Sequence, residues 1–132
     1  MDIYAEEIIA HYEHPHNKGV MKNPDVSFHE HNATCGDDIT VYLEFEGERV
    51  KDVKFEGSGC AISMASASML TDEIKGKDLA AVESMGFKEL VELIGIDPGP
   101  ARLKCATLSL KAVKKAIFLH QHKAVDENTK DL

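Results

Sequence analysis

The stretch ITVYLEFEGERVKDVKFEGSGCAISMASASMLTDEI, residues 39–74, decides the fold. Apolar and polar residues alternate on both sides of Gly47, which indicates two half-buried strands joined by a turn. This part therefore predicts an antiparallel hairpin with one solvent-exposed face. After the GSG at 57–59 the pattern becomes helical over residues 60–74, and the many small residues of this helix favour close packing against the sheet.

The rest of the chain predicts mostly helices around this hairpin. A further strand is expected at about residues 26–31, inside a segment that otherwise has no period. Helices are expected at 3–13, at 78–84, at 87–94, and from near Cys105 onward. Because strands come first and helices follow, we expect an α+β fold: a small antiparallel sheet of about three strands with helices packed on one side.

Length and composition limit the class of protein. The chain has 132 residues, 43% hydrophobic and 29% charged, which is typical of a globular protein. We expect a single domain over residues 1–132, with a frayed tail after about residue 122. The net charge of −8 argues against a nucleic-acid partner, because phosphate binding needs a clustered basic surface.

The sequence also argues against a membrane protein. No apolar run approaches the roughly 20 residues that span a bilayer. The N-terminal stretch is acidic and does not resemble a signal or transit peptide. We therefore expect a cytoplasmic protein with no membrane partner.

Three cysteines carry most of the chemical information. An odd number does not suit a secreted domain held together by disulfides, whereas spaced cysteines in a reducing compartment more often bind metal or carry out thiol chemistry. Cys35 is expected in the loop before the hairpin. Cys60 and Cys105 are each expected at a helix N-terminus, where backbone N–H groups and the helix dipole favour the thiolate. Lys104 adds a positive charge beside Cys105.

Each cysteine taken alone is about equally well explained as a small buried apolar residue. That explanation weakens because all three are expected at junctions between a loop and an element, beside Gly, Asp or Lys. Their long spacings match neither the close pairs of a zinc finger nor the compact runs of a ferredoxin. The residues alone therefore indicate a thiolate-rich site with an oxygen ligand, suited to iron–sulfur, zinc or persulfide chemistry.

Four segments cover residues 4 to about 118: the opening pattern Y-x-x-E-I-I-x-H-Y-x-x-P-x-N-x-G, then NATCGDDI, FEGSGCAISMASASMLTDEIKGK and KCATLSLKAVKKAI. Together they resemble the IscU-type iron–sulfur cluster scaffold family, related to the N-terminal part of NifU. The resemblance implies that Cys35, Cys60 and Cys105 are cluster ligands. It implies that Asp37 is a conditional fourth ligand, or the group that keeps the cluster labile.

The resemblance also implies a function, which is that of a scaffold rather than an enzyme. Such proteins receive persulfide sulfur from a cysteine desulfurase, combine it with iron into a [2Fe–2S] cluster, and pass the cluster to apo-proteins. A ferredoxin is a further candidate partner. We expect Cys105 to be the persulfide acceptor, assisted by Lys104. The alternative is a zinc-bound sulfurtransferase, with Zn²⁺ held at the same four residues and persulfide sulfur accepted on Cys105.

Two features depart from the family pattern. Many members carry a histidine just before the third cysteine, where this chain has Lys104. A basic residue there also occurs in the zinc-bound sulfur-acceptor branch, which usually has a long insertion before its third cysteine that this chain lacks. Where bacterial scaffolds carry an LPPVK-type segment for a dedicated Hsp70, this chain reads DPGPARL, so that partnership is doubtful.

The chain also contains seven histidines. His11 and His14 lie three residues apart on the first helix, and we expect exposed polar residues rather than ligands because nothing nearby completes a site. His29 and His31 flank the Cys35 loop and are the reserve ligands.

Overall fold

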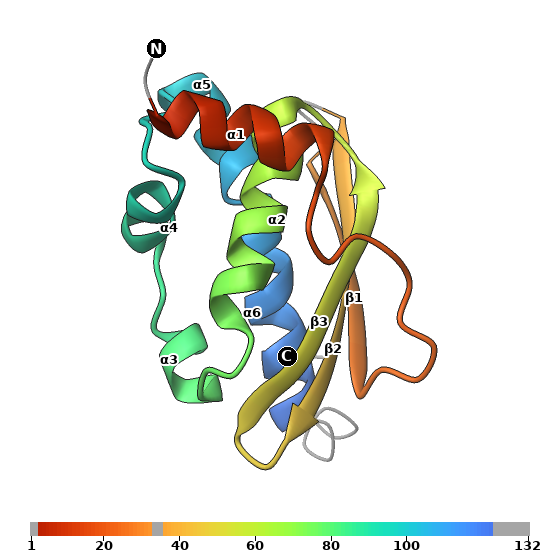
Figure 1. Ribbon diagram of the computed structural model, residues 1–132. Helices are drawn as coiled ribbons and strands as arrows, with labels where there is room; N and C mark the ends of the chain where they lie inside the picture. Colours follow the sequence, from red (N-terminus) through yellow and green to blue (C-terminus); the bar gives the residue numbers. More distant parts are fainter. Residues whose placement is uncertain (1–2, 33–35, 123–132) are drawn as a thin grey trace.

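The computed structural model describes residues 3–32 and 36–122. Within these residues, one antiparallel sheet in the order β1-β2-β3 is covered on one face by helices (Figure 1). The strands are β1 (Val26–Asn32), β2 (Asp37–Glu46) and β3 (Arg49–Ser58). The helices are α1 (Ile3–Glu13), α2 (Ala61–Ile74), α3 (Leu79–Glu83), α4 (Phe87–Ile94), α5 (Pro100–Ala106) and α6 (Leu108–Gln121). The predicted α+β class is confirmed.

The sheet is a simple meander whose helix-facing side is apolar. Ile39, Val41 and Leu43 of β2 are buried and alternate with half-buried residues, as the period of two predicts. The register shifts between Glu44 and Phe45, and this irregularity ends the strict alternation, so that Phe45 is only partly buried.

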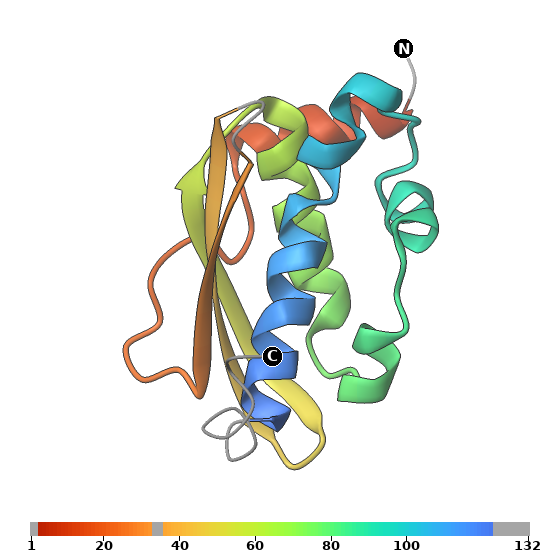
Figure 2. The same cartoon turned by 180° about the vertical axis from the view of Figure 1, so that it is seen from behind.

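Two helices fill the space beside the sheet. Seen from behind, α6 runs alongside α2, with the sheet on one side of the pair and α3 and α4 on the other (Figure 2). Small side chains of α2 are fully buried, which lets this helix approach its neighbours closely. The buried stripe of α6 includes Ala112, Val113, Ala116 and Ile117. The core therefore lies between the sheet and the α2–α6 pair.

The last helix differs from the prediction, because it is two helices and not one. α5 begins at Pro100, five residues before Cys105, and Gly99 precedes it with a left-handed φ of 77°. Proline suits the first turn of a helix, where its missing N–H costs nothing. Thr107 then separates α5 from α6. Cys105 thus lies in the last turn of α5, and the prediction that it begins the final helix is wrong.

The segment after α1 is fastened to the edge of β3. Gly19 donates its N–H to the Phe55 carbonyl at 2.8 Å, and Phe55 donates to the Asn17 carbonyl at 3.0 Å. Asn17 has a left-handed φ of 62°, a conformation that asparagine tolerates better than most residues. This pairing positions residues 16 and 17 against α2.

The predicted frayed tail falls mostly on residues 123–132, which lie outside the described residues. Among the residues that the structure describes, no helix combines the length and the apolar character needed to cross a membrane.

Candidate metal centre

Three residues that are distant in the sequence meet at one end of the helix–sheet interface. One potential ligand atom from each of Asp37, Cys60 and Cys105 lies within 4.8 Å of the others. They come from three different elements: the start of β2, the residue just before α2, and the last turn of α5. The structure thus brings together three of the four predicted ligands. The fourth, Cys35, lies outside the described residues.

Asp37 is a buried carboxylate, only 3% exposed. Its Oδ1 accepts the backbone N–H of Cys60 at 3.2 Å, and its Oδ2 accepts a hydrogen bond from Ser63 Oγ. The thiol Sγ of Cys60 lies 3.7 Å from the same Oδ2. A carboxylate removed from water requires such donors, and here they hold one of its oxygens beside a thiol.

Two glycines allow β3 to end so close to the start of β2. A Cβ on Gly59 would lie 2.8 Å from Asp37 Cγ, and a Cβ on Gly57 would lie 2.2 Å from the Asp38 carbonyl oxygen. Immediately after them, Cys60 is the N-cap of α2, with φ −71° and ψ 168°. The prediction that Cys60 stands at a helix N-terminus is confirmed.

Cys105 has a different setting from the predicted one. It is buried, at 5% exposure, and it lies near the C-terminal end of α5, where the helix dipole has the opposite sign and does not favour a thiolate. The dipole argument for Cys105 is therefore wrong. Its position at the centre comes instead from packing, with Ser63 Oγ 3.0 Å from its carbonyl oxygen.

Lys104 is exposed and faces a polar hollow of about 270 Å³ next to this centre. The hollow is lined by His31, Asn32, Lys104, Thr107, Leu108 and Lys111. Its positive charges come from Lys104 and from Lys111, which also lies 3.8 Å from Glu30 Oε1, and they suit the approach of an anionic group. Of the two reserve ligands, His31 lies in this lining, while Nε2 of His29 lies 3.4 Å from Asp38 Oδ1.

Ser63 is the residue of this centre that the sequence did not reveal. It is buried at 2% exposure, and its Oγ lies within hydrogen-bonding distance of both Asp37 Oδ2 and the Cys105 carbonyl. It also lies 3.7 Å from Cys60 Sγ. The available signal was its spacing, because residues three apart share a helix face, and Ser63 follows Cys60 by three positions.

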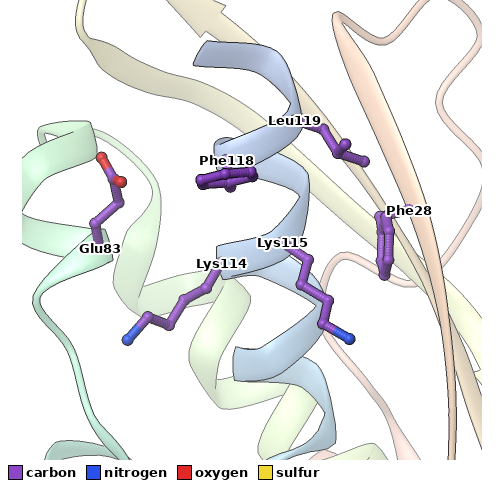
Figure 3. Close-up of a pocket in the computed structure, with 6 residues that line it drawn as sticks. All are labelled: Phe28, Glu83, Lys114, Lys115, Phe118 and Leu119. Carbon is purple, nitrogen blue, oxygen red and sulfur yellow. The ribbon is translucent and has the colours of Figure 1, made fainter. Parts of the chain in front are cut away.

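A larger hollow of about 510 Å³ lies over the C-terminal half of α6, away from this centre (Figure 3). Its two lysines are engaged: Lys114 donates to the Met85 carbonyl at 2.7 Å, and Lys115 pairs with Glu30 at 3.0 Å. Among the described residues, the lining exposes mostly apolar surface and includes no cysteine, histidine or aspartate; these residues are Phe28, Glu83, Lys114, Lys115, Phe118 and Leu119. This hollow therefore does not contribute to the metal centre.

Comparison with known proteins identifies the family. The protein-family model described as the NifU-like N-terminal domain matches residues 3–127 of this chain. The chain belongs to this family. As a NifU-like domain it resembles the zinc-dependent sulfurtransferase SufU of Bacillus subtilis (strain 168), with 42% identity over 132 residues that cover 87% of this chain and 89% of that protein. It also resembles the iron–sulfur cluster assembly scaffold protein IscU of Streptococcus pyogenes serotype M1, with 33% identity over 148 residues that cover 98% and 92%.

Solved structures agree with this assignment. The crystal structure of a nitrogen-fixing NifU-like protein (N-terminal) from Brucella abortus matches with a TM-score of 0.75 and 25% identity, covering 92% of this chain and 96% of that one. The IscU-type resemblance is thus confirmed, and this NifU-like domain belongs among the iron–sulfur cluster assembly scaffold proteins. Both alignments, of 132 and 148 residues, are longer than the 87% and 98% of this chain that they cover, so each relative carries residues that this chain lacks. The absence of an insertion from this chain therefore does not decide whether it is more similar to SufU or to IscU.

Proposed function

We propose that this protein is a scaffold on which a [2Fe–2S] cluster is assembled and from which it passes to apo-proteins in the cytoplasm. The observation that supports it most is the meeting of Asp37, Cys60 and Cys105 within 4.8 Å. Thiolates are the usual ligands of iron–sulfur clusters. A carboxylate oxygen is a harder ligand than a thiolate and exchanges more readily, so the mixed set suits a cluster that must leave.

Cys35 is proposed as the third thiolate ligand. It precedes Asp37 by two residues, so their Cα atoms are separated by at most about 7 Å. The N–H of Gly36 bonds to the Asn32 carbonyl at 2.8 Å, so the chain on both sides of Cys35 leads to the end of the sheet that carries Asp37. With Cys35, the centre would offer three thiolates and one carboxylate to the cluster.

A cysteine desulfurase is the proposed source of sulfur. The Cys105 thiolate attacks the outer sulfur of the desulfurase persulfide, a new S–S bond forms on Cys105, and the desulfurase cysteine leaves as a thiolate. Each transferred sulfur then needs two electrons to become sulfide, which two successive one-electron transfers from reduced ferredoxin would supply. Lys104 supports the approach of the anionic persulfide because it lines the basic hollow beside Cys105.

The same residues support a second function, that of a zinc-dependent sulfurtransferase. Two observations favour it: the lysine at position 104 and the 42% identity with SufU. Three thiolates and one carboxylate are a suitable tetrahedral set for Zn²⁺, which would hold the cysteines as thiolates. Cys105 would remain the residue that accepts sulfur.

Anaerobic reconstitution separates the two functions. The protein is incubated with ferrous iron, cysteine, a cysteine desulfurase and a thiol reductant, and its visible spectrum and metal content are recorded. We expect cluster absorption in the wild type and its loss in Cys60→Ser. Ser66→Ala is the control, because Ser66 is a buried serine of the same helix that does not belong to the Asp37, Cys60 and Cys105 group. A protein that forms no cluster, keeps one tightly bound zinc and accelerates the desulfurase would contradict the scaffold and support the sulfurtransferase.

A further inference from the structure

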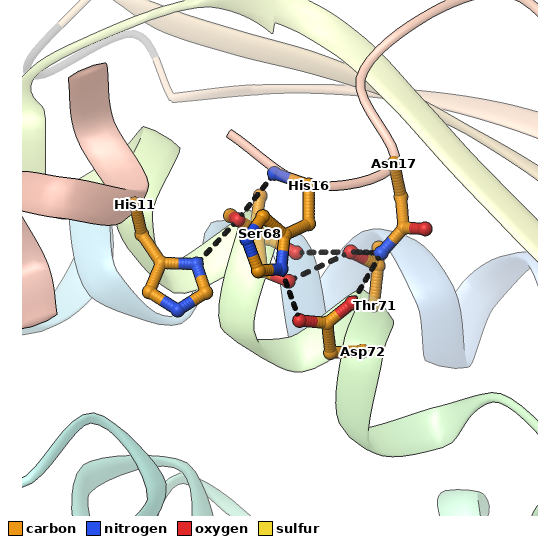
Figure 4. Close-up of polar contacts among 7 residues, drawn as sticks. His11, His16, Asn17, Ser68, Thr71 and Asp72 are labelled. Atoms are coloured by element: carbon orange, nitrogen blue, oxygen red, sulfur yellow. Dashed lines mark hydrogen bonds and ion pairs between the residues drawn. The ribbon is translucent and has the colours of Figure 1, made fainter. Parts of the chain in front are cut away.

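A second group of potential metal ligands lies on the outer side of α2, where α1 ends (Figure 4). It consists of His11 from α1, His16 from the loop that follows, and Asp72 from the last turn of α2. One ligand atom of each lies within 4.8 Å of the others. Asp72 lies twelve positions after Cys60, which corresponds to about 18 Å along a helix, so this group is distinct from the cysteine centre.

The two imidazole rings face each other beside the carboxylate. Their centroids are 4.5 Å apart with an interplanar angle of 52°, and Nδ1 of His16 lies 2.5 Å from Asp72 Oδ2. Two ligands that are each about 2.1 Å from one ion lie about 3.0 to 3.4 Å apart. The separation of 2.5 Å between His16 Nδ1 and Asp72 Oδ2 is shorter than that range, and the ligand atoms of all three residues lie within 4.8 Å of one another. An ion that replaced the proton between His16 and Asp72 would thus require only small movements.

Neighbouring polar groups already orient these side chains. Ser68 Oγ accepts the backbone N–H of His16 at 2.7 Å and lies 2.6 Å from Nδ1 of His11. Asn17 donates its side-chain amide to Asp72 Oδ1 at 2.9 Å. Partners of this kind fix the rings and carboxylates of metal sites and contribute to metal affinity.

The protonation states also suit metal binding. Burial and the neighbouring His16 lower the pKa of His11, which favours the neutral form of its imidazole. Burial alone would raise the pKa of Asp72, but the hydrogen bonds from His16 and Asn17 outweigh it and lower that pKa. A neutral imidazole and an ionised carboxylate are the forms that bind metal.

The group is open to solvent on one side. A hollow of about 220 Å³ is lined by His11, Met69, Asp72, Glu73 and Leu93. The side chains of His16 and Asp72 are 55% and 44% exposed. An ion can therefore enter without unfolding, and water can complete its coordination.

We propose that His11, His16 and Asp72 form a second site, for one divalent transition metal ion. Two imidazole nitrogens and one carboxylate oxygen, with the remaining positions left to water, suit Zn²⁺ and Fe²⁺. This corrects the expectation that nothing completes a site around His11, because the partners are His16 and Asp72 rather than His14. This second site does not depend on whether the protein acts as a cluster scaffold or as a zinc-dependent sulfurtransferase.

Titration with Co²⁺ tests the proposal, because cobalt bound to thiolate shows a charge-transfer band that cobalt bound to nitrogen and oxygen lacks. In the wild type we expect one equivalent of bound Co²⁺ that adds nothing to this band. His16→Ala and Asp72→Asn should each weaken its binding by about 10- to 100-fold or more, while any thiolate band persists and shows that the variant is folded. His14→Ala is the matched control and should leave the affinity within about twofold, since His14 is an exposed histidine outside the group.

A second measurement uses the wild type alone. Bound Co²⁺ should broaden the amide resonances of Ser68 and Thr71 in a two-dimensional NMR spectrum. This broadening should appear at the Co²⁺ concentration at which the equivalent that adds nothing to the thiolate band becomes bound. The proposal is overturned if this equivalent is absent, if it binds equally well in both variants, or if it broadens other regions and leaves Ser68 and Thr71 unchanged.

Discussion

Asp37 occupies its buried position because two small residues make room and supply a donor. Gly59 leaves space, since a Cβ there would lie 2.9 Å from Asp37 Oδ1 as well as close to Cγ. Ser63 directs its hydroxyl at the other oxygen. At the scale of single residues, the acidic ligand therefore depends on positions that carry no metal-binding chemistry of their own.

Replacement of Gly59 by alanine should disturb this arrangement. The added methyl group would push the Asp37 carboxylate away from the Cys60 N–H, and a buried carboxylate that loses a donor destabilises the protein by about 1–3 kcal/mol. Denaturant unfolding of the metal-free protein measures this cost. Gly86→Ala is the control, because its Cβ would meet only the flexible side chain of Glu89, at 3.3 Å. If Gly59→Ala has the same unfolding free energy as the wild type, the site accommodates the added methyl group without loss of the Asp37 hydrogen bond.

Asp37 itself should control how quickly the cluster leaves. We expect Asp37→Ala to hold a reconstituted cluster longer and to transfer it to an apo-ferredoxin several-fold more slowly, because the most exchangeable ligand is gone. Asp38→Ala removes the adjacent carboxylate, which contacts His29 and Ser58, and should transfer at the wild-type rate. If Asp37→Ala also transfers at that rate, the proposed role of this carboxylate is wrong.

At the scale of elements, a cross-strand pair links the solvent-facing sides of β2 and β3. Tyr42 donates its hydroxyl to Glu56 Oε1 at 2.5 Å. This hydrogen bond, together with burial and the charge of Glu56, raises the pKa of Tyr42 above its usual value of 10.0. The folded protein therefore holds the phenol proton more tightly than the unfolded chain does.

This pair predicts a loss of stability in alkali. The contribution of the Tyr42–Glu56 hydrogen bond to the free energy of unfolding is fully present below pH 10. It is lost as the pH rises through the raised pKa of Tyr42 in the folded state. The tyrosinate absorbance should show Tyr42 titrating above pH 10, and Glu56→Gln should lower its midpoint. Glu44→Gln is the control, since Glu44 lies on the same strand as Tyr42, β2, but pairs with Lys51. A midpoint that is unchanged in Glu56→Gln would mean that the hydrogen bond does not hold the proton.

The elements that the sequence predicted well are those with clear boundaries. Glycines mark both the hairpin turn and the approach to α2, so the limits of β2, β3 and α2 could be read from the sequence. The division between α5 and α6 carries neither glycine nor proline. There the Thr107 hydroxyl bonds back to the Leu103 carbonyl at 2.9 Å, a local alternative to helix continuation that composition does not reveal.

At the scale of the whole molecule, tertiary contacts decide what the sequence could not show. The one-sided sheet follows from alternation along single strands, which is local information. The junction positions of the cysteines indicated one shared thiolate-rich site, but their spacing does not require Cys60 and Cys105 to meet, and only the family resemblance named Asp37 as the oxygen ligand. The group of His11, His16 and Asp72 was missed, since it forms only when the loop after α1 docks on the distant end of α2.

Helix α2 connects the two groups of ligands, with Cys60 at its N-cap and Asp72 in its last turn. A separation of about 18 Å along the helix axis is far too long for a ligand to bridge two ions, so metal bound at one end must be released to solvent before it reaches the other. The same separation is nevertheless short enough for a measurable dipolar coupling between two unpaired electron spins. With a paramagnetic ion at the histidine end and a reduced cluster at the cysteine end, pulsed electron spin resonance would measure the distance between the two spins.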